Sequence, residues 1–138
     1  MKAIDTNVLV RVLLGDEPRA QVDAARALMV SAEQGYKIFI SAFVLLETAW
    51  VLKSKGRVAS DIARAFEALL HTEGIVVSMR PQFLAALSRF RDLAPRVGLA
   101  DCLILADAAE HDALPLFSFD EALCGAEPGR VASPIPRS

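Results

Sequence analysis

Cysteine and histidine are scarce in this chain of 138 residues, which contains two of each. Cys102 and Cys124 do not form a Cys-x-x-Cys pair, so a zinc site built from thiolates is not expected. Two cysteines are also too few for a disulfide scaffold, and they fit a reducing, intracellular environment. His71 and His111 fall at the ends of expected helices, where a solvated role is the simpler interpretation. The chain therefore shows no Ser-His-Asp or Cys-His arrangement that would carry nucleophilic catalysis.

Long apolar runs and excess positive charge are missing as well. No uninterrupted apolar segment approaches the roughly 18 residues that a membrane-spanning helix needs, and no signal-peptide core precedes Asp5. We therefore expect a cytoplasmic protein without membrane contact. The 15 Lys and Arg residues against 17 Asp and Glu give a net charge of −2. This balance argues against attachment to nucleic acid by bulk positive charge, but it leaves room for an enzyme that meets nucleic acid through metal ions.

Alanine and leucine dominate the composition, with 23 and 18 residues respectively. Both favour helices, and the length is that of one globular domain with its own core. We expect a single domain over residues 1–138. Its residues 128–138, which include Pro134 and Pro136, are expected to form an extended C-terminal tail with Val131 on an edge strand.

Short strand-like segments alternate with helical segments along the chain. The expected strands are 2–4, 37–40, 75–77 and 114–119. The expected helices lie between and after them, at 8–14, 17–34, 42–53, 61–70, 81–94, 99–111 and 121–123. Asp16 and Ser60 are the expected N-caps of the second and fourth of these helices. Strands separated by helices predict an α/β fold, with a central parallel sheet of four to five short strands and helices on both faces.

Two aspartates stand where expected strands end. Asp5 ends the first strand, and Asp120 follows the fourth. Ligands of open parallel sheets bind beyond the carboxyl ends of the strands, so both positions are candidates for chemistry. Each aspartate is equally suited to cap the helix that follows it, and the sequence leaves both interpretations open.

Glu47 lies in the helix expected at 42–53, which is apolar almost all round and is therefore expected to be buried. Its neighbours three and four positions away are all apolar: Phe43, Val44, Trp50 and Val51. Glu47 is thus expected to face the core, where a carboxylate is costly unless it is paired or binds a metal ion. The alternative to a metal site is a buried salt bridge, for example with Arg11.

Asp101 opens the helix expected at 99–111 and shares a face with the apolar residues Ile104 and Leu105. This pattern turns the acid inward, although a first-turn acid is also favoured by the helix dipole alone. Four acids arranged in this way would repel one another without a cation. All-oxygen ligation suits Mg²⁺ or Mn²⁺ rather than zinc.

Four segments, taken in order, carry a family resemblance. They are Ile4-Asp5-Thr6-Asn7, Glu47 in its apolar helix, Gly98-Leu99-Ala100-Asp101-Cys102-Leu103-Ile104, and Phe117-Ser118-Phe119-Asp120. In order and spacing this set resembles the PIN-domain ribonucleases over essentially the whole chain. Within that family it looks closest to the VapC-type toxins of bacterial toxin–antitoxin pairs. The resemblance implies a PIN-like three-layer sandwich.

The same resemblance implies an endoribonuclease that depends on Mg²⁺ or Mn²⁺ and hydrolyses RNA phosphodiester bonds with a metal-activated water. Its catalytic, metal-binding acids map onto Asp5, Glu47, Asp101 and Asp120. Its supporting polar residues map onto Thr6, Asn7 and Ser118. The toxin branch typically forms a homodimer and is inhibited by a small antitoxin with a DNA-binding part. The partners implied are therefore RNA, an antitoxin and a second copy of the chain.

Basic residues follow the helix that contains Glu47. Lys53, Lys55 and Arg57 lie about 9–15 Å beyond Glu47 along the helix axis and are weak candidates for contacts with RNA phosphates. The alternative is a solvated helix end with Gly56 as its stop. Few exposed aromatic residues are expected, which favours recognition of RNA by shape and backbone.

Two other functions compete with the nuclease. A catalytically idle PIN-like binding module would keep the fold and use the acids only structurally, and the intact set of four acids argues against it. A phosphoaspartate receiver or a haloacid-type phosphatase would want a second aspartate two residues after Asp5 or a late lysine. Asn7 occupies the first position, and Lys55 is the last lysine of the chain.

Overall fold

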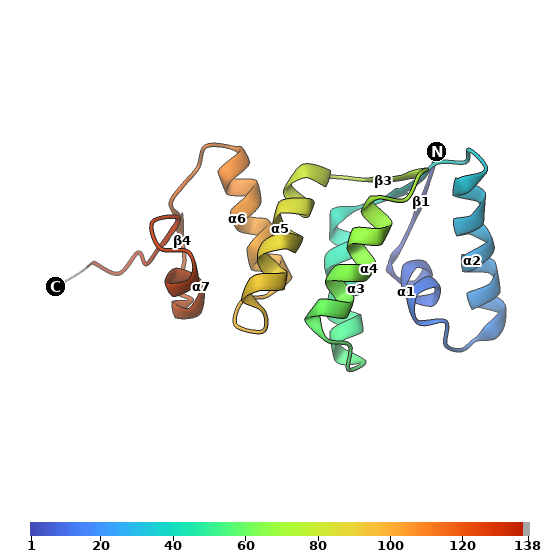
Figure 1. Ribbon diagram of the computed structural model, residues 1–138, viewed down its shortest axis with the longest axis horizontal. Helices are drawn as coiled ribbons and strands as arrows, with labels where there is room; N and C mark the ends of the chain where they lie inside the picture. The colour runs from blue at the N-terminus through green and yellow to red at the C-terminus, as the bar shows by residue number, and fades with distance from the viewer. Residues whose placement is uncertain (137–138) are drawn as a thin grey trace. The chain divides into compact units, whose positions relative to one another are not determined.

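The computed structural model describes residues 1–136 (Figure 1). The chain divides into two compact units, an N-terminal unit, Met1–Arg80, and a C-terminal unit, Pro81–Ser138. Residues 1–136 form seven helices, a three-stranded parallel sheet and a two-stranded parallel sheet. The expected α/β fold class is confirmed, and the five short strands pair as three and two. No helix within this part of the chain has the length and apolar character needed to cross a membrane.

The N-terminal unit is built on its three-stranded sheet, in which the central strand β2 pairs in parallel with β1 and β3. The elements of this unit are β1 (Lys2–Ile4), α1 (Thr6–Leu14), α2 (Arg19–Glu33), β2 (Ile38–Ile40), α3 (Ala42–Ser54), α4 (Ala59–Leu70) and β3 (Ile75–Val77). Helix α1 packs against both α2 and α3, and α3 packs against α4. Parallel strands need such helical crossovers to return the chain to the same sheet edge.

Burial alternates along β2 and β3 of this sheet. Ile38 and Ile40 of β2 are buried, as are Ile75 and Val77 of β3, whereas Val76 between them is exposed. Side chains of a strand point alternately to its two faces, so one face of the sheet carries the apolar core. The largest fully buried side chains of the unit are Phe66, Leu9, Ile38, Ile40, Leu45, Val22 and Thr48.

The C-terminal unit contains the remaining elements. They are α5 (Arg80–Leu93), α6 (Leu99–Glu110), β4 (Leu116–Phe117), α7 (Glu121–Ala126) and β5 (Val131–Ala132). Strands β4 and β5 pair in parallel over two residues each, so β4 is shorter than the expected 114–119. Val131 lies on a strand, as expected, while residues 137 and 138 of the expected tail lie outside the described residues.

A buried carboxylate holds part of the C-terminal unit together. Glu127 is buried, and its Oε1 accepts from Arg89 Nε at 2.6 Å and pairs with Arg89 Nη2 at 2.5 Å. Its Oε2 pairs with Arg130 Nη1 at 3.3 Å. This triad could not be predicted from the sequence, because Arg89 and Glu127 are 38 positions apart.

Two helix starts differ from expectation. Helix α2 begins after Pro18, which occupies the N-cap position with an extended backbone, and not after Asp16. Proline disfavours a helical conformation of the residue before it, so Glu17 cannot join the first turn. Helix α4 has Val58 at its N-cap, and Ser60 is the second residue of the helix and does not cap it.

Candidate active site

Asp5 connects β1 to α1. Its backbone is extended, and its Oδ1 accepts a hydrogen bond from the Val8 backbone N–H at 3.0 Å. The N-cap interpretation of Asp5 is therefore confirmed. The cap occupies one carboxylate oxygen, and within residues 1–136 no hydrogen bond engages the other. Because Asp5 is exposed, capping and ligand binding are compatible at this residue.

Glu47 is connected to the start of α1 through a hydroxyl group. The buried Thr6 donates a short hydrogen bond from Oγ1 to Glu47 Oε1, between residues 41 positions apart. Thr6 directly follows Asp5, so this bond brings the carboxylate of α3 to the carboxyl end of β1. The alternative salt bridge to Arg11 is not formed, since Arg11 Nε donates to Gln21 Oε1 at 3.2 Å.

The expectation that Glu47 faces the core is wrong. Glu47 is exposed, and so are Phe43 (77%) and Trp50 (70%) on the same side of α3. The helix buries its other side, including Leu45 and Thr48. A helix that is apolar almost all round has no periodic pattern to indicate which side is buried, and this explains the error.

A cavity of about 550 Å³ lies beside Asp5 in the N-terminal unit. Its polar lining comes from Asp5, Asn7, Arg11 and Gln21, and its apolar lining from α1 and α2. Asn7 and Arg11 are four positions apart on α1, so they share one face of the helix. This spacing could have identified Arg11 from the sequence as a cation close to the acids.

Asp120 repeats the arrangement of Asp5 in the C-terminal unit. It follows β4, and its Oδ1 accepts from the Leu123 backbone N–H at 3.0 Å, which caps α7. Ser118 Oγ accepts from the Asp120 backbone N–H at 3.0 Å. Ser118 therefore fixes the backbone of Asp120, consistent with the supporting position implied for it.

Asp101 lies in the first turn of α6, after Gly98 at the N-cap. Its side chain is half-buried, and Ile104 on the same face is exposed, so the expected inward orientation holds only in part. Burial, together with the negative charge of Asp101, raises the pKa of the neighbouring Cys102 to about 11. That thiol is protonated at neutral pH and is not a nucleophile.

The four candidate acids are divided between the units, with Asp5 and Glu47 in one and Asp101 and Asp120 in the other. Across residues 1–136, no group of three or more Asp, Glu, His or Cys side chains lies together in a way that could hold a metal ion. The donor chemistry nevertheless fits Mg²⁺ or Mn²⁺, because carboxylate oxygens are their preferred protein ligands.

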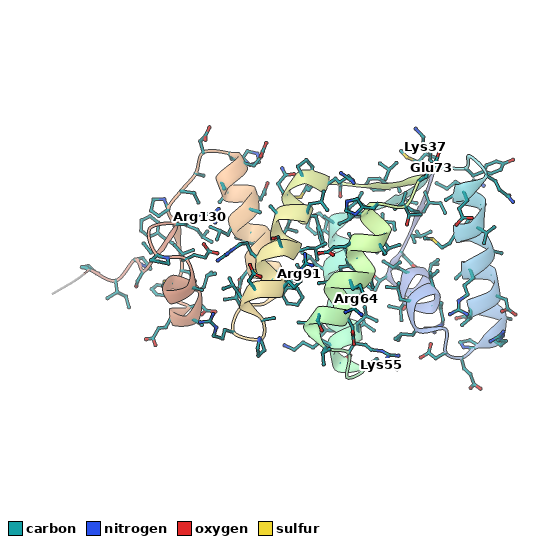
Figure 2. All side chains as sticks on the ribbon, viewed as in Figure 1. Lys37, Lys55, Arg64, Glu73, Arg91 and Arg130 are labelled. Carbon is teal, nitrogen blue, oxygen red and sulfur yellow. The ribbon has the colours of Figure 1, made fainter. Side chains whose placement is uncertain are left out.

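The basic residues after Glu47 are all exposed. Lys53 lies in the last turn of α3, Lys55 is its C-cap, and Arg57 follows; Figure 2 shows Lys55 where the chain leaves α3. In the part of the chain that the structure describes, none of the three forms an ion pair. They remain predicted contacts for RNA phosphates.

Exposed aromatic side chains are more numerous than expected. Among residues 1–136, five aromatic side chains are exposed: Tyr36, Phe43, Trp50, Phe117 and Phe119. The expectation of few such residues is therefore wrong. Four of the five lie close in sequence to a candidate acid, and Tyr36 does not.

Comparison with protein families matches a family model described as the PIN domain over residues 2–127. The chain belongs to the PIN-domain family. Proteins of this family are generally nucleases that depend on a metal ion, usually Mg²⁺. Comparison with curated proteins found no match, and comparison with solved structures found none either.

Proposed function

We propose that this protein is an endoribonuclease that depends on Mg²⁺ or Mn²⁺ and uses the acids Asp5, Glu47, Asp101 and Asp120. The observation that carries the proposal is the hydrogen bond from Thr6 to Glu47. It places the carboxylate of α3 at the strand end where Asp5 lies, the edge at which ligands of parallel sheets bind. A protein that bound RNA without cleaving it would not need a hydroxyl group that orients this carboxylate.

In this proposal each acid has a role. Asp5, Glu47 and Asp101 hold the metal ion, and Asp120 holds a water molecule of that ion or a second ion. When bound, the metal ion lowers the pKa of a water molecule and neutralises charge on the phosphate. The chain supplies the support. Thr6 orients Glu47, while Asn7 and Ser118 are the further polar groups that keep the carboxylates in place.

The test is cleavage of an unstructured RNA by the purified protein with Mg²⁺, with Mn²⁺ and with EDTA. We expect cleavage with either metal and none with EDTA. Glu47→Gln should lower the rate by more than about 100-fold, because loss of a ligand costs more than the ~10–100-fold of an outer-shell residue. Glu33→Gln is the matched control, since Glu33 is an exposed acid on α2.

Three outcomes would contradict the proposal. Cleavage that survives EDTA would exclude a metal-dependent reaction, and cleavage that Glu47→Gln leaves unchanged would exclude Glu47 as a metal ligand. Binding of RNA without any metal-dependent cleavage would instead identify the catalytically idle binding module.

We further propose that the protein is the toxin of a bacterial toxin–antitoxin pair, acting in the cytoplasm as a homodimer until a small antitoxin inhibits it. The support is the ordered resemblance of its four segments to VapC-type toxins. A short reading frame for a DNA-binding protein should lie immediately upstream. Expression of this chain alone should arrest growth, co-expression of that neighbour should restore it, and Asp5→Asn should be harmless. A monomeric mass in solution at high concentration would contradict the dimer.

A further inference from the structure

A second cavity, of about 470 Å³, lies within the C-terminal unit, and its walls come from α5, α6 and α7. It shares no residue with the cavity beside Asp5, and its lining residues all lie between positions 81 and 130. Its volume is in the range of small-molecule sites, which are mostly apolar with a few convergent polar groups. The large apolar side chains of the lining are Leu93, Leu105 and Leu123.

The cavity exists because two helices present small side chains to it. Ala85 and Ser88 lie three positions apart on α5. Ala106 and Ala109 have the same spacing on α6. Residues at this spacing share one face of a helix, so each helix contributes a short stretch without bulky side chains. The space between them is lined by aliphatic groups and, among residues 1–136, by no aromatic ring.

The charged end of the cavity is the triad of Arg89, Glu127 and Arg130. The side chain of Glu127 is 6% exposed, and its two arginine partners leave one positive charge in excess. Asp92 and Glu110 carry negative charge nearby, but both are exposed, so water and salt screen them. A positive charge that is partly removed from water attracts an anion.

Arg130 has hydrogen-bonding groups left over, and Arg89 has few. Arg89 uses both Nε and Nη2 for Glu127, whereas Arg130 uses only Nη1. Within residues 1–136, no hydrogen bond engages Nε or Nη2 of Arg130. A neutral ligand that covered these groups would remove them from water without replacing their hydrogen bonds, which is costly. A carboxylate satisfies both groups at once, because it forms two parallel hydrogen bonds with a guanidinium.

We propose that this cavity binds a small organic acid, with its carboxylate on Nε and Nη2 of Arg130 and its aliphatic body between α5 and α6. The inference is independent of the proposed nuclease function, and it involves neither RNA nor a metal ion. The two arginines would repel a cationic ligand, and the unpaired N–H groups of Arg130 disfavour a neutral one. The charge of the triad and the aliphatic walls thus define the two ends of the ligand.

Octanoate is the probe for the test, and octanamide is its neutral counterpart of nearly the same shape. Binding of each compound to the full chain is measured by isothermal titration calorimetry in a buffer with EDTA and without RNA. We expect octanoate to bind with 1:1 stoichiometry. It should bind about 10- to 100-fold more tightly than octanamide, because hydrogen bonds to charged groups are stronger than those between neutral groups.

Variants of Arg130 test the contact with the carboxylate. Arg130→Gln should weaken octanoate binding by about 10- to 100-fold and leave octanamide binding unchanged. Arg130→Lys keeps the charge but loses the paired N–H groups, and its affinity for octanoate should lie between those of wild type and Arg130→Gln. Arg96→Gln is the matched control, because Arg96 is an exposed arginine of the same unit that does not line the cavity.

Ala109→Leu tests the cavity without altering the triad. The larger side chain should occupy the space of the aliphatic body and weaken both compounds by about 10-fold, which corresponds to the loss of about two buried CH₂ groups. Its melting temperature should not fall, because the side chain enters existing space. This variant also decides the matter if Arg130→Gln fails to fold, since it leaves all partners of Glu127 in place.

Several results would overturn the inference. Octanoate that does not bind, or that binds no more tightly than octanamide, would exclude a site for organic acids. Full affinity for octanoate in a folded Arg130→Gln or in Ala109→Leu would mean that the compound binds elsewhere on the protein. Because no measurement uses RNA cleavage, each of these results would leave the proposed function intact.

Discussion

Each unit contains one aspartate at the end of a strand and one acid on a helix. The acid on the helix is oriented by different contacts in the two units. Asp5 and Asp120 both accept from the backbone N–H three residues ahead, at 3.0 Å. Glu47 is further tied to α1 by Thr6, whereas no hydrogen bond within residues 1–136 holds the side chain of Asp101. The N-terminal pair of acids is thus oriented by a side-chain contact between elements, whereas the C-terminal pair is oriented by its helix starts and by the contact of Ser118 with the Asp120 backbone.

The two units also differ in the hydrogen bonding of their buried polar groups. In the N-terminal unit the hydroxyl of Thr48 is buried and, within the described residues, has no hydrogen-bond partner. In the C-terminal unit the buried Glu127 has partners on both oxygens. A buried polar group lowers the stability of the protein when it has no hydrogen-bond partner. When it has a partner, removing the group lowers the stability. The same kind of substitution should therefore have opposite effects in the two units.

The largest effect is expected from removing the charge of the two capping aspartates. Asp5→Asn and Asp120→Asn should each lower RNA cleavage by about 1,000-fold, which corresponds to about 4 kcal/mol. Thermal melting should barely change, because asparagine caps a helix as well as aspartate. Asp16→Asn is the control, since Asp16 is exposed and caps no helix. Cleavage at the wild-type rate would exclude the altered aspartate from the site.

Glu127→Gln should be the most destabilising of these substitutions. It leaves Arg89 and Arg130 without their shared negative charge, and removing one partner of a buried ion pair costs about 3 kcal/mol. Urea unfolding measures the loss, and Glu121→Gln in the exposed first turn of α7 should cost little by comparison. Equal stability of the two variants would mean that the triad contributes nothing to the C-terminal unit.

Thr6→Val tests the contact that distinguishes the two pairs of acids. It removes the donor to Glu47 with little change in shape, and activity should fall by about 10–100-fold, as for other residues that orient metal ligands. Thr6→Ser restores the hydroxyl and should recover most of the rate. The apparent affinity for Mn²⁺, read from the metal dependence of cleavage, should weaken in Thr6→Val and not in Thr6→Ser. An unchanged metal dependence would contradict the orienting role.

Thr48→Val should stabilise the N-terminal unit. It replaces an unpaired buried hydroxyl by a methyl group of similar size, which should raise the free energy of unfolding by about 1 kcal/mol. Thr48→Ser, which keeps the hydroxyl and loses a methyl group, should lower it. A less stable Thr48→Val would show that the hydroxyl has a partner in solution.

The smallest effect concerns Cys102 and appears only in alkaline solution. Burial raises the pKa of this thiol from 9.0 to about 11. The folded state therefore keeps the thiol proton up to a higher pH than the unfolded state does. The stability that this provides is complete below pH 9 and is lost as the pH rises through 11. The free energy of unfolding should therefore decline less steeply over that range in Cys102→Ala. Thiol labelling at pH 8 should modify Cys124 and spare Cys102.

Much of the fold was predictable from local signals. The strands at 2–4 and 75–77 were predicted with their observed bounds, and the acids at the strand ends follow from the order of elements. Contacts between distant residues were not predictable. Thr6 and Glu47 are 41 positions apart, and Arg89 and Glu127 are 38 apart, so neither pair leaves a periodic signal. The exposed side of α3 was not predictable either, because the helix is apolar almost all round.

The hydrogen bond between Thr6 and Glu47 also has a consequence for local opening of the chain. It joins the first turn of α1 to the middle of α3, so fraying of α1 releases the carboxylate at the same moment. Amide hydrogen exchange near Thr6 and near Glu47 should then follow one shared opening event. Separate exchange rates at the two positions would show that this hydrogen bond does not couple the candidate site to the start of the first helix.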